Sequence, residues 1–384
     1  MHGTDNLRIL TYLREHLQEM TALLVQLVEM ESSSYDKPSI DRLGGFLAEQ
    51  ARGLGAMVET LPQAKSGDHL RARWGGGPGG VLLLCHMDTV WEPGTVVRRP
   101  IRIEDGLFYG PGAFDMKGGI VNALWAMRAL LDLDLLPDRR VTLLLTSDEE
   151  IGSRTSRAVI ESEALRHDAV FVLEPAQPPH ASLKTSRKGV GLYVVTVTGR
   201  PAHAGADHEK GINAVEEMAH QILEIQQFTE YGAGTTVNVG VVRGGTRSNV
   251  VPAQATARVD VRVTDAAEAR RLDARMHSLT PRLPGASIDV SGGINRPPMV
   301  RSDGAARLYA QAAALGGKLG LRITEASSGG GSDGNFTAAL NIPTLDGLGV
   351  VGDGGHAEHE HVVLASMPER AALLAALIRL GGTP

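Results

Sequence analysis

Three short apolar segments constrain the fold of this chain more than any other feature. They are VLLLC at 81–85, VTLLLTS at 141–147 and DAVFVLEP at 168–175. Each is apolar without interruption and is flanked by Gly, Pro or polar residues, which predicts a strand buried on both faces. Helical patterns lie between them, the clearest being IVNALWAMRALLDL at 120–133. Strands that alternate with helices predict an α/β fold, with a mostly parallel sheet covered by helices.

The pattern changes after about Lys188, where the expected strands alternate apolar and polar residues, as in GLYVVTVTG, TTVNVGVV and ATARVDVRV. Such strands belong to a sheet with one solvated face. Their order with two helical stretches, 212–228 and 266–279, is strand, helix, strand, strand, helix, strand, which is typical of a ferredoxin-like α+β unit. We therefore expect one domain over residues 1–187 and 299–384, with a second domain inserted over residues 188–298.

Composition excludes several classes of protein. The net charge of −6 is spread over interspersed acidic and basic residues, so we expect no nucleic-acid partner. The sequence contains no run of about 18 apolar residues, so we expect no membrane span. The one cysteine, Cys85, lies in an apolar segment, so we expect it to be a buried hydrophobic residue. The first 20 residues read as an amphipathic helix rather than a signal peptide, which predicts a cytoplasmic protein unless a secretory signal was trimmed.

Four clusters of ligand-type residues follow the apolar segments. They are HMD at 86–88, FDMKGG around Asp115, DEE at 148–150 and LEP at 173–175. Three of them stand at the carboxyl ends of expected parallel strands, where open α/β sheets bind their ligands. A single carboxylate at such a place usually caps a helix or meets solvent. Four clusters at one edge would repel one another unless a cation lay among them, so we expect a metal site.

The donor types narrow the choice of metal. Histidine and carboxylate ligands without thiolates suit Zn²⁺, with Co²⁺ or Mn²⁺ as substitutes. One glutamate of the adjacent pair at 149 and 150 would bind metal, while the other would take the proton of a metal-bound water as general base.

The motifs of this chain, taken together, resemble those of a known family. The strings HMDTV, GAFDMKGG, TSDEEIGS, LEP, GRPAHAG, RSNVVPA, GGGSDGNF and GGHAEHEHV occur in the order typical of the zinc aminoacylase and carboxypeptidase metallopeptidases. That family includes acetylornithine deacetylase, succinyl-diaminopimelate desuccinylase, aminoacylase and glutamate carboxypeptidase. The resemblance covers nearly the whole chain and is strongest to the glutamate carboxypeptidase type.

The resemblance implies two zinc ions per chain and a role for each motif. Asp115 would bridge both ions, Glu149 would be the general base, and Asp88 would hold an imidazole ligand in place. The remaining ligands would be His86, Glu150, Glu174 and a C-terminal histidine. The string HAEHEH offers His356, His359 and His361 for that last position. His356 fits the family pattern best and His359 is the alternative.

The resemblance also implies residues that contact substrate. His203 would reach across the interface of a homodimer and polarise the scissile carbonyl. Asn249 matches a motif that suggests a further substrate contact. Arg262 and Arg296 are candidates to bind a substrate carboxylate, because a planar guanidinium pairs well with that group, and we weight Arg296 above Arg262. By default a histidine, asparagine or arginine at such positions would be a turn or surface residue.

These residues predict hydrolysis of a peptide or amide bond in a small peptide or N-acyl amino acid that carries a free carboxylate. An exopeptidase that releases a C-terminal amino acid such as glutamate is the leading hypothesis. An N-acyl-amino-acid deacylase is the alternative within the family, and an inactive binding protein with the same fold is a remote one. The inserted domain would serve in dimerisation or as a lid.

Overall fold

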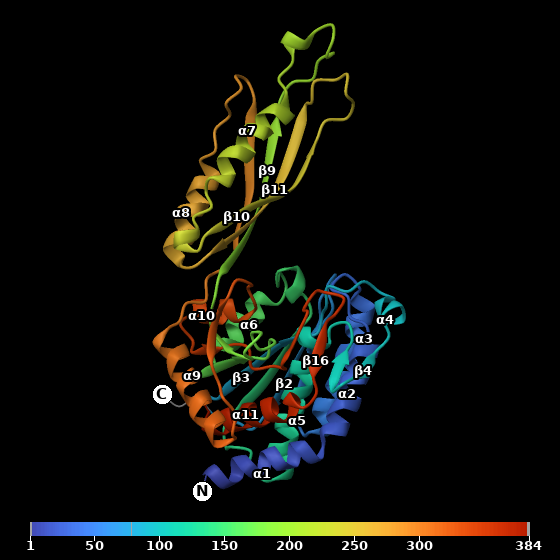
Figure 1. Cartoon of the computed structure of the whole chain (residues 1–384), viewed down its shortest axis with the longest axis vertical. Helices are drawn as coiled ribbons and strands as arrows, with labels where there is room; N and C mark the ends of the chain where they lie inside the picture. Colours follow the sequence, from blue (N-terminus) through green and yellow to red (C-terminus); the bar gives the residue numbers. More distant parts are fainter. Residues whose placement is uncertain (1, 78, 382–384) are drawn as a thin grey trace. The chain divides into compact units, whose positions relative to one another are not determined.

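The computed structural model describes residues 2–77 and 79–381 (Figure 1). The chain divides into two compact units. The first runs to Ser186 and resumes over Arg301–Ser328 and from Ser332 onward. The second comprises Arg187–Val300 and Gly329–Gly331.

A six-stranded sheet lies at the centre of the first unit. Its strand order is β1 (Met57–Leu61), β2 (His69–Trp74), β6 (Val141–Thr146), β3 (Val81–His86), β7 (Ala169–Val172) and β14 (Thr344–Leu345). The four strands from β6 to β14 are parallel, whereas β1 and β2 add an antiparallel edge. The three apolar segments therefore form the middle of a mostly parallel sheet, as predicted.

Helices cover both faces of this sheet, which explains why its strands are apolar throughout. Val81, Leu83 and Cys85 of β3 belong to one hydrophobic cluster, whereas Leu82 and Leu84 belong to another on the opposite face. The first cluster contains side chains of α1 (His2–Glu15), α2 (Leu17–Glu29), α3 (Lys37–Gly53), α5 (Gly118–Asp132), α9 (Asp303–Lys318) and α11 (Ser366–Leu380). The second contains side chains of α6 (Arg157–Ala164) and α10 (Gly334–Ala339).

A smaller sheet in the first unit was not predicted from the sequence. Its order is β15 (Gly352–Asp353), β16 (His361–Val363), β5 (Leu107–Tyr109) and β4 (Arg102–Glu104). Strands of two or three residues are too short to show a periodic pattern. The pairing of His361 with Tyr109 and of Val362 with Phe108 brings the chain before Asp115 beside the chain after His356. The remaining short elements are α4 (Thr95–Arg98) and the pair of strands β8 (Leu183–Arg187) and β13 (Glu325–Ser328).

The second unit is a four-stranded antiparallel sheet with two helices, in the predicted ferredoxin-like order. Its elements are β9 (Gly189–Thr198), α7 (Ala214–Gln226), β10 (Thr236–Gly244), β11 (Gln254–Val263), α8 (Ala266–His277) and β12 (Ser287–Arg296), with spatial order β10-β11-β9-β12. Tyr193, Val195 and Val197 of β9 are fully buried and share a core with Met218 of α7 and Leu272 of α8. The helices therefore cover the apolar face of the sheet.

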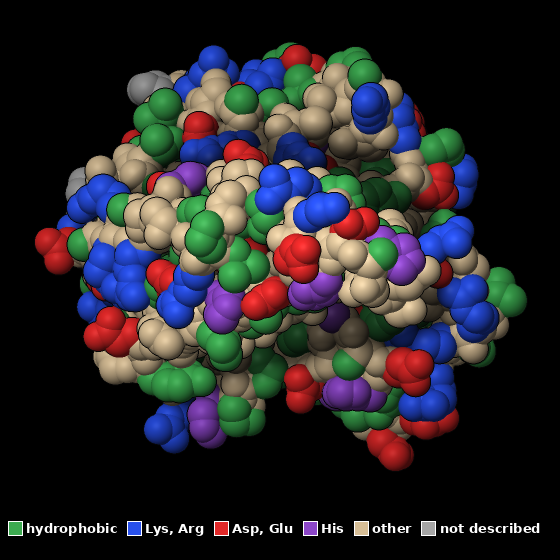
Figure 2. All heavy atoms as spheres, turned by 90° about the horizontal axis from the view of Figure 1, so that it is seen from above, with side chains coloured by type: hydrophobic (Ala, Val, Ile, Leu, Met, Phe, Trp, Pro, Cys, Tyr) green, Lys and Arg blue, Asp and Glu red, His purple; other side chains and the backbone are tan. Residues whose placement is uncertain are grey.

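Charged side chains of both signs are mixed on the surface. On the face that Figure 2 shows, acidic and basic side chains are interspersed, in keeping with the mixed charges along the sequence. Over residues 2–77 and 79–381, none of the helices combines the length and the hydropathy that crossing a membrane requires.

Candidate metal centre

The carboxyl ends of three neighbouring strands build one side of the centre. His86 is the last residue of β3, which lies between β6 and β7. After β6 the chain enters residues 147–155, here called the acidic turn, whose short helix η2 (Glu149–Ile151) contains Glu149 and Glu150. Glu174 follows the end of β7. Because parallel strands end at the same edge of a sheet, the acidic turn and Glu174 lie beside His86.

Asp115 comes from a loop rather than a strand. It lies in the irregular helical turn η1 (Ala113–Lys117), and its peptide bond to Met116 is cis. The fully buried Glu360 supports this loop, because its carboxylate accepts hydrogen bonds from the main-chain N–H groups of Gly112, Phe114 and Asp115 at 2.8–3.1 Å. Burial raises the pKa of Glu360 to about 7 despite these hydrogen bonds. The small sheet thus places the aspartate by bringing Glu360 to its loop.

The carboxylate of Asp115 presents one oxygen to each of two histidines. Its Oδ1 lies 3.3 Å from Nε2 of His86, and its Oδ2 lies 3.3 Å from Nε2 of His356. Glu174 Oε1 lies 3.6 Å from the same nitrogen of His86. Both carboxylate oxygens of Glu150 lie 3.2 Å from Nε2 of His356. Two groups, each a histidine and a glutamate, therefore share one aspartate.

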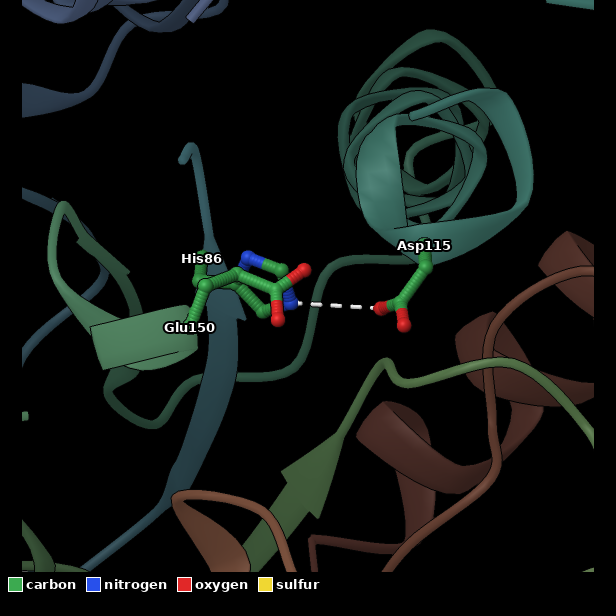
Figure 3. A group of neighbouring side chains, drawn as sticks. All are labelled: His86, Asp115 and Glu150. Atoms are coloured by element: carbon green, nitrogen blue, oxygen red, sulfur yellow. Dashed lines mark hydrogen bonds and ion pairs between the residues drawn. The ribbon is translucent and has the colours of Figure 1, made fainter. Parts of the chain in front are cut away.

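Figure 3 shows three of these side chains, His86, Asp115 and Glu150, converging from separate elements. One ligand atom from each of them lies within 4.8 Å of the others, as expected of side chains that can hold one ion. The tautomer of His86 suits this purpose. Its Nδ1 donates to the main-chain oxygen of Asp88 at 2.9 Å, so a ring that gives up its Nε2 proton would offer that nitrogen to a cation held by the same carboxylates.

Electrostatics also favour a cation here. Burial and the neighbouring charge of Asp115 raise the pKa of Glu150 to about 7, although the interaction with His356 opposes this shift. The carboxylates of Asp115 and Glu150 raise the pKa of His356 to about 11. Burial opposes the charge of His86, but Asp115, Asp88 and Glu174 outweigh it and hold its pKa well above the usual value. A divalent cation among these oxygen and nitrogen donors would relieve the excess of negative charge, so the donor set fits such an ion.

Asp88 connects β3 to the acidic turn. Its carboxylate accepts hydrogen bonds from the main-chain N–H groups of Glu149 and Glu150 at 3.1 Å each, and from Ser34 Oγ at 2.8 Å. Its Oδ1 also lies 3.5 Å from Nδ1 of His86. The side chain therefore contacts His86 and in addition fixes the backbone of both glutamates.

The three C-terminal histidines differ in their surroundings. The ring of His356 meets Asp115 and Glu150, and its backbone adopts the left-handed region with φ 63°, which is uncommon outside glycine. His359 is exposed. The ring of His361 lies 5.4 Å from that of Tyr109, and its Nδ1 donates to the main-chain oxygen of His359 at 3.0 Å.

Sequence reasoning missed two buried carboxylates that support the centre. The support that Glu360 gives to the Asp115 loop had no local signal in the sequence. Asp333, in the loop SSGGGSDGNF, is 3% exposed and accepts hydrogen bonds from Thr146 Oγ1 at 3.1 Å and from Ser153 Oγ. An acidic residue within a run of small residues was the available signal for Asp333.

Within the second unit, His203 and Asn249 lie on adjacent segments. His203 pairs with Val250 in an antiparallel bridge, and the N–H of Ala204 donates to the main-chain oxygen of Asn249 at 3.0 Å. Nδ1 of His203 accepts from the main-chain N–H groups of Gly205 and Ala206 at 3.1 and 3.0 Å. A neutral His203 ring therefore carries its hydrogen on Nε2, which leaves an N–H donor for a ligand.

The two candidate arginines of this unit have different partners. Arg262 forms two hydrogen bonds with Asp260, at 2.8 and 3.0 Å. Arg296, at the end of β12, is 5% exposed. A Cβ atom added at Gly331 would lie 2.9 Å from its Cδ, so the glycine loop passes directly over Arg296. The structure brings Arg296 and this loop together, whereas it engages Arg262 in an internal ion pair.

Comparisons with known proteins agree with this architecture. Residues 82–380 match the model of Peptidase family M20/M25/M40. The chain is 32% identical to Carboxypeptidase G2 of Pseudomonas sp. (strain RS-16) over 92% of its own length and 87% of that protein. It is 27% identical to acetylornithine deacetylase of Proteus mirabilis over 71% and 72% of the two chains.

Solved structures show the same fold at lower identity. A metallo-carboxypeptidase of the M20 family from Sulfolobus solfataricus superposes with a TM-score of 0.74 at 18% identity, covering 95% of this chain and 99% of that one. The aminopeptidase PepT from Bacillus cereus gives a TM-score of 0.75 at 22% identity, covering 96% and 99%. The chain belongs to Peptidase family M20/M25/M40 and is a hydrolase of amide bonds.

Proposed function

We propose that the chain is an exopeptidase that releases a C-terminal amino acid such as glutamate. It uses two divalent metal ions, and zinc is the metal that we propose for both. The observation that carries the proposal is the position of Asp115 between His86 and His356, with one carboxylate oxygen facing each. One ion would be held by His86, Asp115 and Glu174, and the other by His356, Asp115 and Glu150. Co²⁺ or Mn²⁺ would substitute, since they accept the same donors.

The ions would supply positive charge that polarises the scissile carbonyl and lowers the pKa of a water molecule. Glu149 then acts as general base, because it takes a proton from the attacking water and returns it to the leaving nitrogen. Asp88 keeps Glu149 in place through the main-chain hydrogen bond at 3.1 Å. His203 contributes through its Nε2–H, which can donate to the carbonyl oxygen as negative charge develops there.

Substrate selection rests on the second unit in this proposal. Arg296, nearly buried beneath the glycine loop, would pair with the free α-carboxylate of the substrate, and Asn249 would contact the substrate near His203. Support for a carboxypeptidase also comes from the relative named Carboxypeptidase G2. Arg262 is the weaker candidate because Asp260 already neutralises it.

An N-acyl-amino-acid deacylase is the second candidate, favoured by the similarity to acetylornithine deacetylase. A panel of C-terminal glutamyl conjugates and N-acetyl amino acids, tested on zinc-loaded protein, separates the two activities by their kcat/KM values. Hydrolysis of the conjugates above the N-acetyl compounds supports the exopeptidase, and the reverse order supports the deacylase. Failure to cleave any amide, with one equivalent of metal or none, would instead indicate a binding protein.

The proposal extends to the assembly. His203 would act in the site of a partner chain, so we infer a homodimer formed through the second unit. Size-exclusion chromatography with light scattering tests it, and an active monomer would contradict that role of His203. The cytoplasmic location stays a prediction.

A further inference from the structure

One buried histidine near the acidic turn has no part in the proposed chemistry. His69, the first residue of β2, is 0% exposed, and both of its ring nitrogens meet hydroxyl groups of the turn. Nδ1 lies 3.0 Å from Ser147 Oγ, and Nε2 lies 3.1 Å from Thr155 Oγ1. The imidazole therefore connects the first and last residues of the acidic turn.

The direction of these hydrogen bonds follows from the available protons. Ser147 Oγ is also hydrogen-bonded to the main-chain oxygen of Gly67, which can only accept. Ser147 must therefore use its proton there and accept from Nδ1–H of His69. The approach of Gly67 is close, because a Cβ atom added to it would lie 2.4 Å from Ile40 Cγ2 and 3.2 Å from Ser147 Cβ.

Thr155 carries the connection to the start of the turn. Its main-chain N–H donates to Oδ2 of Asp148 at 2.7 Å, and its hydroxyl lies 2.8 Å from the same oxygen. Asp148 directly precedes the base and ligand pair. The single hydroxyl proton of Thr155 can go to Asp148 Oδ2 or to a neutral His69, and a charged His69 donates to the hydroxyl oxygen, while the N–H bond to Asp148 persists in each case. The connection therefore does not depend on the charge of His69.

We propose that His69 is a positioning residue that clamps the acidic turn through Ser147 and Thr155, and thereby orients Glu149 and Glu150. Asp88 holds the N–H groups of these glutamates from the side of β3, and His69 holds the ends of the turn from the side of β2. The clamp itself concerns only the conformation of this chain. Its effect on turnover rests on the proposed function.

Hydrogen exchange tests the clamp without metal or substrate. In metal-free protein, His69→Gln should accelerate exchange of the amides of residues 148–155 by about tenfold, the effect of losing roughly 1.4 kcal/mol of local hydrogen bonding. The matched control is His167→Gln, since His167 is also a buried histidine of the first unit, bonded to Glu163 O at 2.7 Å and Thr142 Oγ1 at 2.9 Å. Equal exchange of the turn in both variants would overturn the proposal.

Thr155 provides an independent check, including for the case in which His69→Gln folds poorly. Thr155→Val, which keeps the shape and removes the hydroxyl, should accelerate exchange as His69→Gln does, and Thr155→Ser should restore protection. Because the two residues share the hydrogen bond between His69 and Thr155, the double variant should accelerate exchange by less than the combined effects of the two single variants. Fully additive effects would show that the two residues act separately, against the clamp.

Kinetics then extend the test to function. With zinc restored and a cleaved substrate, His69→Gln should lower kcat by about 100-fold, as expected when catalytic groups are misplaced by about an ångström, and leave KM within a factor of about two. His167→Gln should leave both constants near those of the wild type. A wild-type protein that cleaves nothing would refute the proposed function, whereas the exchange experiment would still decide whether the clamp exists.

Discussion

At the scale of single residues, the two adjacent glutamates divide their roles. Glu150 meets His356, whereas Glu149 is the proposed base. We expect Glu149→Gln to lower kcat by about 100- to 10,000-fold, the usual contribution of a general base, because an amide cannot take the proton of water. Metal content, measured by inductively coupled plasma mass spectrometry, should stay at two equivalents.

Glu358 is exposed and lies in the same histidine-rich loop as His356. Its variant Glu358→Gln is the matched control for Glu149→Gln. It should retain wild-type turnover. Appreciable activity in Glu149→Gln, or loss of its metal, would contradict the assigned role.

His356 tests the sharing of Asp115. The geometry predicts that His356→Ala loses one of two ions, because His86, Asp115 and Glu174 form a group without it. Asp115→Asn should weaken both sites, since each of its oxygens faces a different histidine. Metal titration followed by calorimetry distinguishes these outcomes.

His359→Ala serves as the control for the choice among the C-terminal histidines. It should keep both ions. If His359→Ala loses an ion and His356→Ala does not, the ligand assignment is reversed.

Arg296 tests the class of substrate. A charge-assisted contact with a carboxylate contributes about 1.5–3 kcal/mol, so Arg296→Ala should lower kcat/KM for a C-terminal glutamyl substrate by about 10- to 100-fold. Arg262→Ala should have a small effect, because its guanidinium already pairs with Asp260. Unchanged kcat/KM in Arg296→Ala would refute the contact.

At the scale of elements, the sequence predicted what periodicity and strand ends can reveal. The three apolar strands and the alternating strands of the second unit all appear where expected. The edge strands β1 and β2 and the small sheet were not predicted. β1 is largely exposed, Arg71 and Arg73 interrupt the apolar residues of β2, and the strands of the small sheet are only two to three residues long. The sequence therefore revealed the ligand-type residues but not the supports, Glu360 and Asp333, whose hydrogen bonds span 180 or more residues of sequence.

The glycine loop offers a prediction at this scale. A Cβ atom at Gly331 would lie 2.8 Å from Val190 Cγ2 and 2.9 Å from Arg296 Cδ, so Gly331→Ala must displace the loop or the arginine. We expect KM for a C-terminal glutamyl substrate to rise by about tenfold, roughly 1.4 kcal/mol of lost binding. The matched control is Gly329→Ala, where an added Cβ meets no atom within 4 Å. Equal constants in both variants would contradict a role of this packing in binding.

At the scale of the whole molecule, the buried His167 makes the free energy of unfolding depend on pH. Burial lowers the pKa of His167, so the folded chain keeps its ring neutral. Below about pH 6.5 the unfolded chain binds more protons than the folded one. The stability from neutral His167 is therefore present above about pH 6.5 and is lost as the pH falls further.

Urea denaturation at pH 7.5 and 5.5 measures this contribution. The free energy of unfolding should fall more steeply in the wild type than in His167→Gln, by up to about 1.4 kcal/mol per pH unit. Parallel pH dependences in the two proteins would show that His167 is not kept neutral by the fold.

The ends of the second unit have a consequence for how such chains can be rebuilt. Arg187 and Met299 exchange two main-chain hydrogen bonds, at 2.9 and 3.0 Å, so the segment between them leaves and returns at one point in space. Antiparallel neighbours of this kind can be joined by a turn of about two residues. We therefore expect residues 188–298 to form a cassette, which can be cut out with one short splice or exchanged for that of a relative through two junctions that lie side by side.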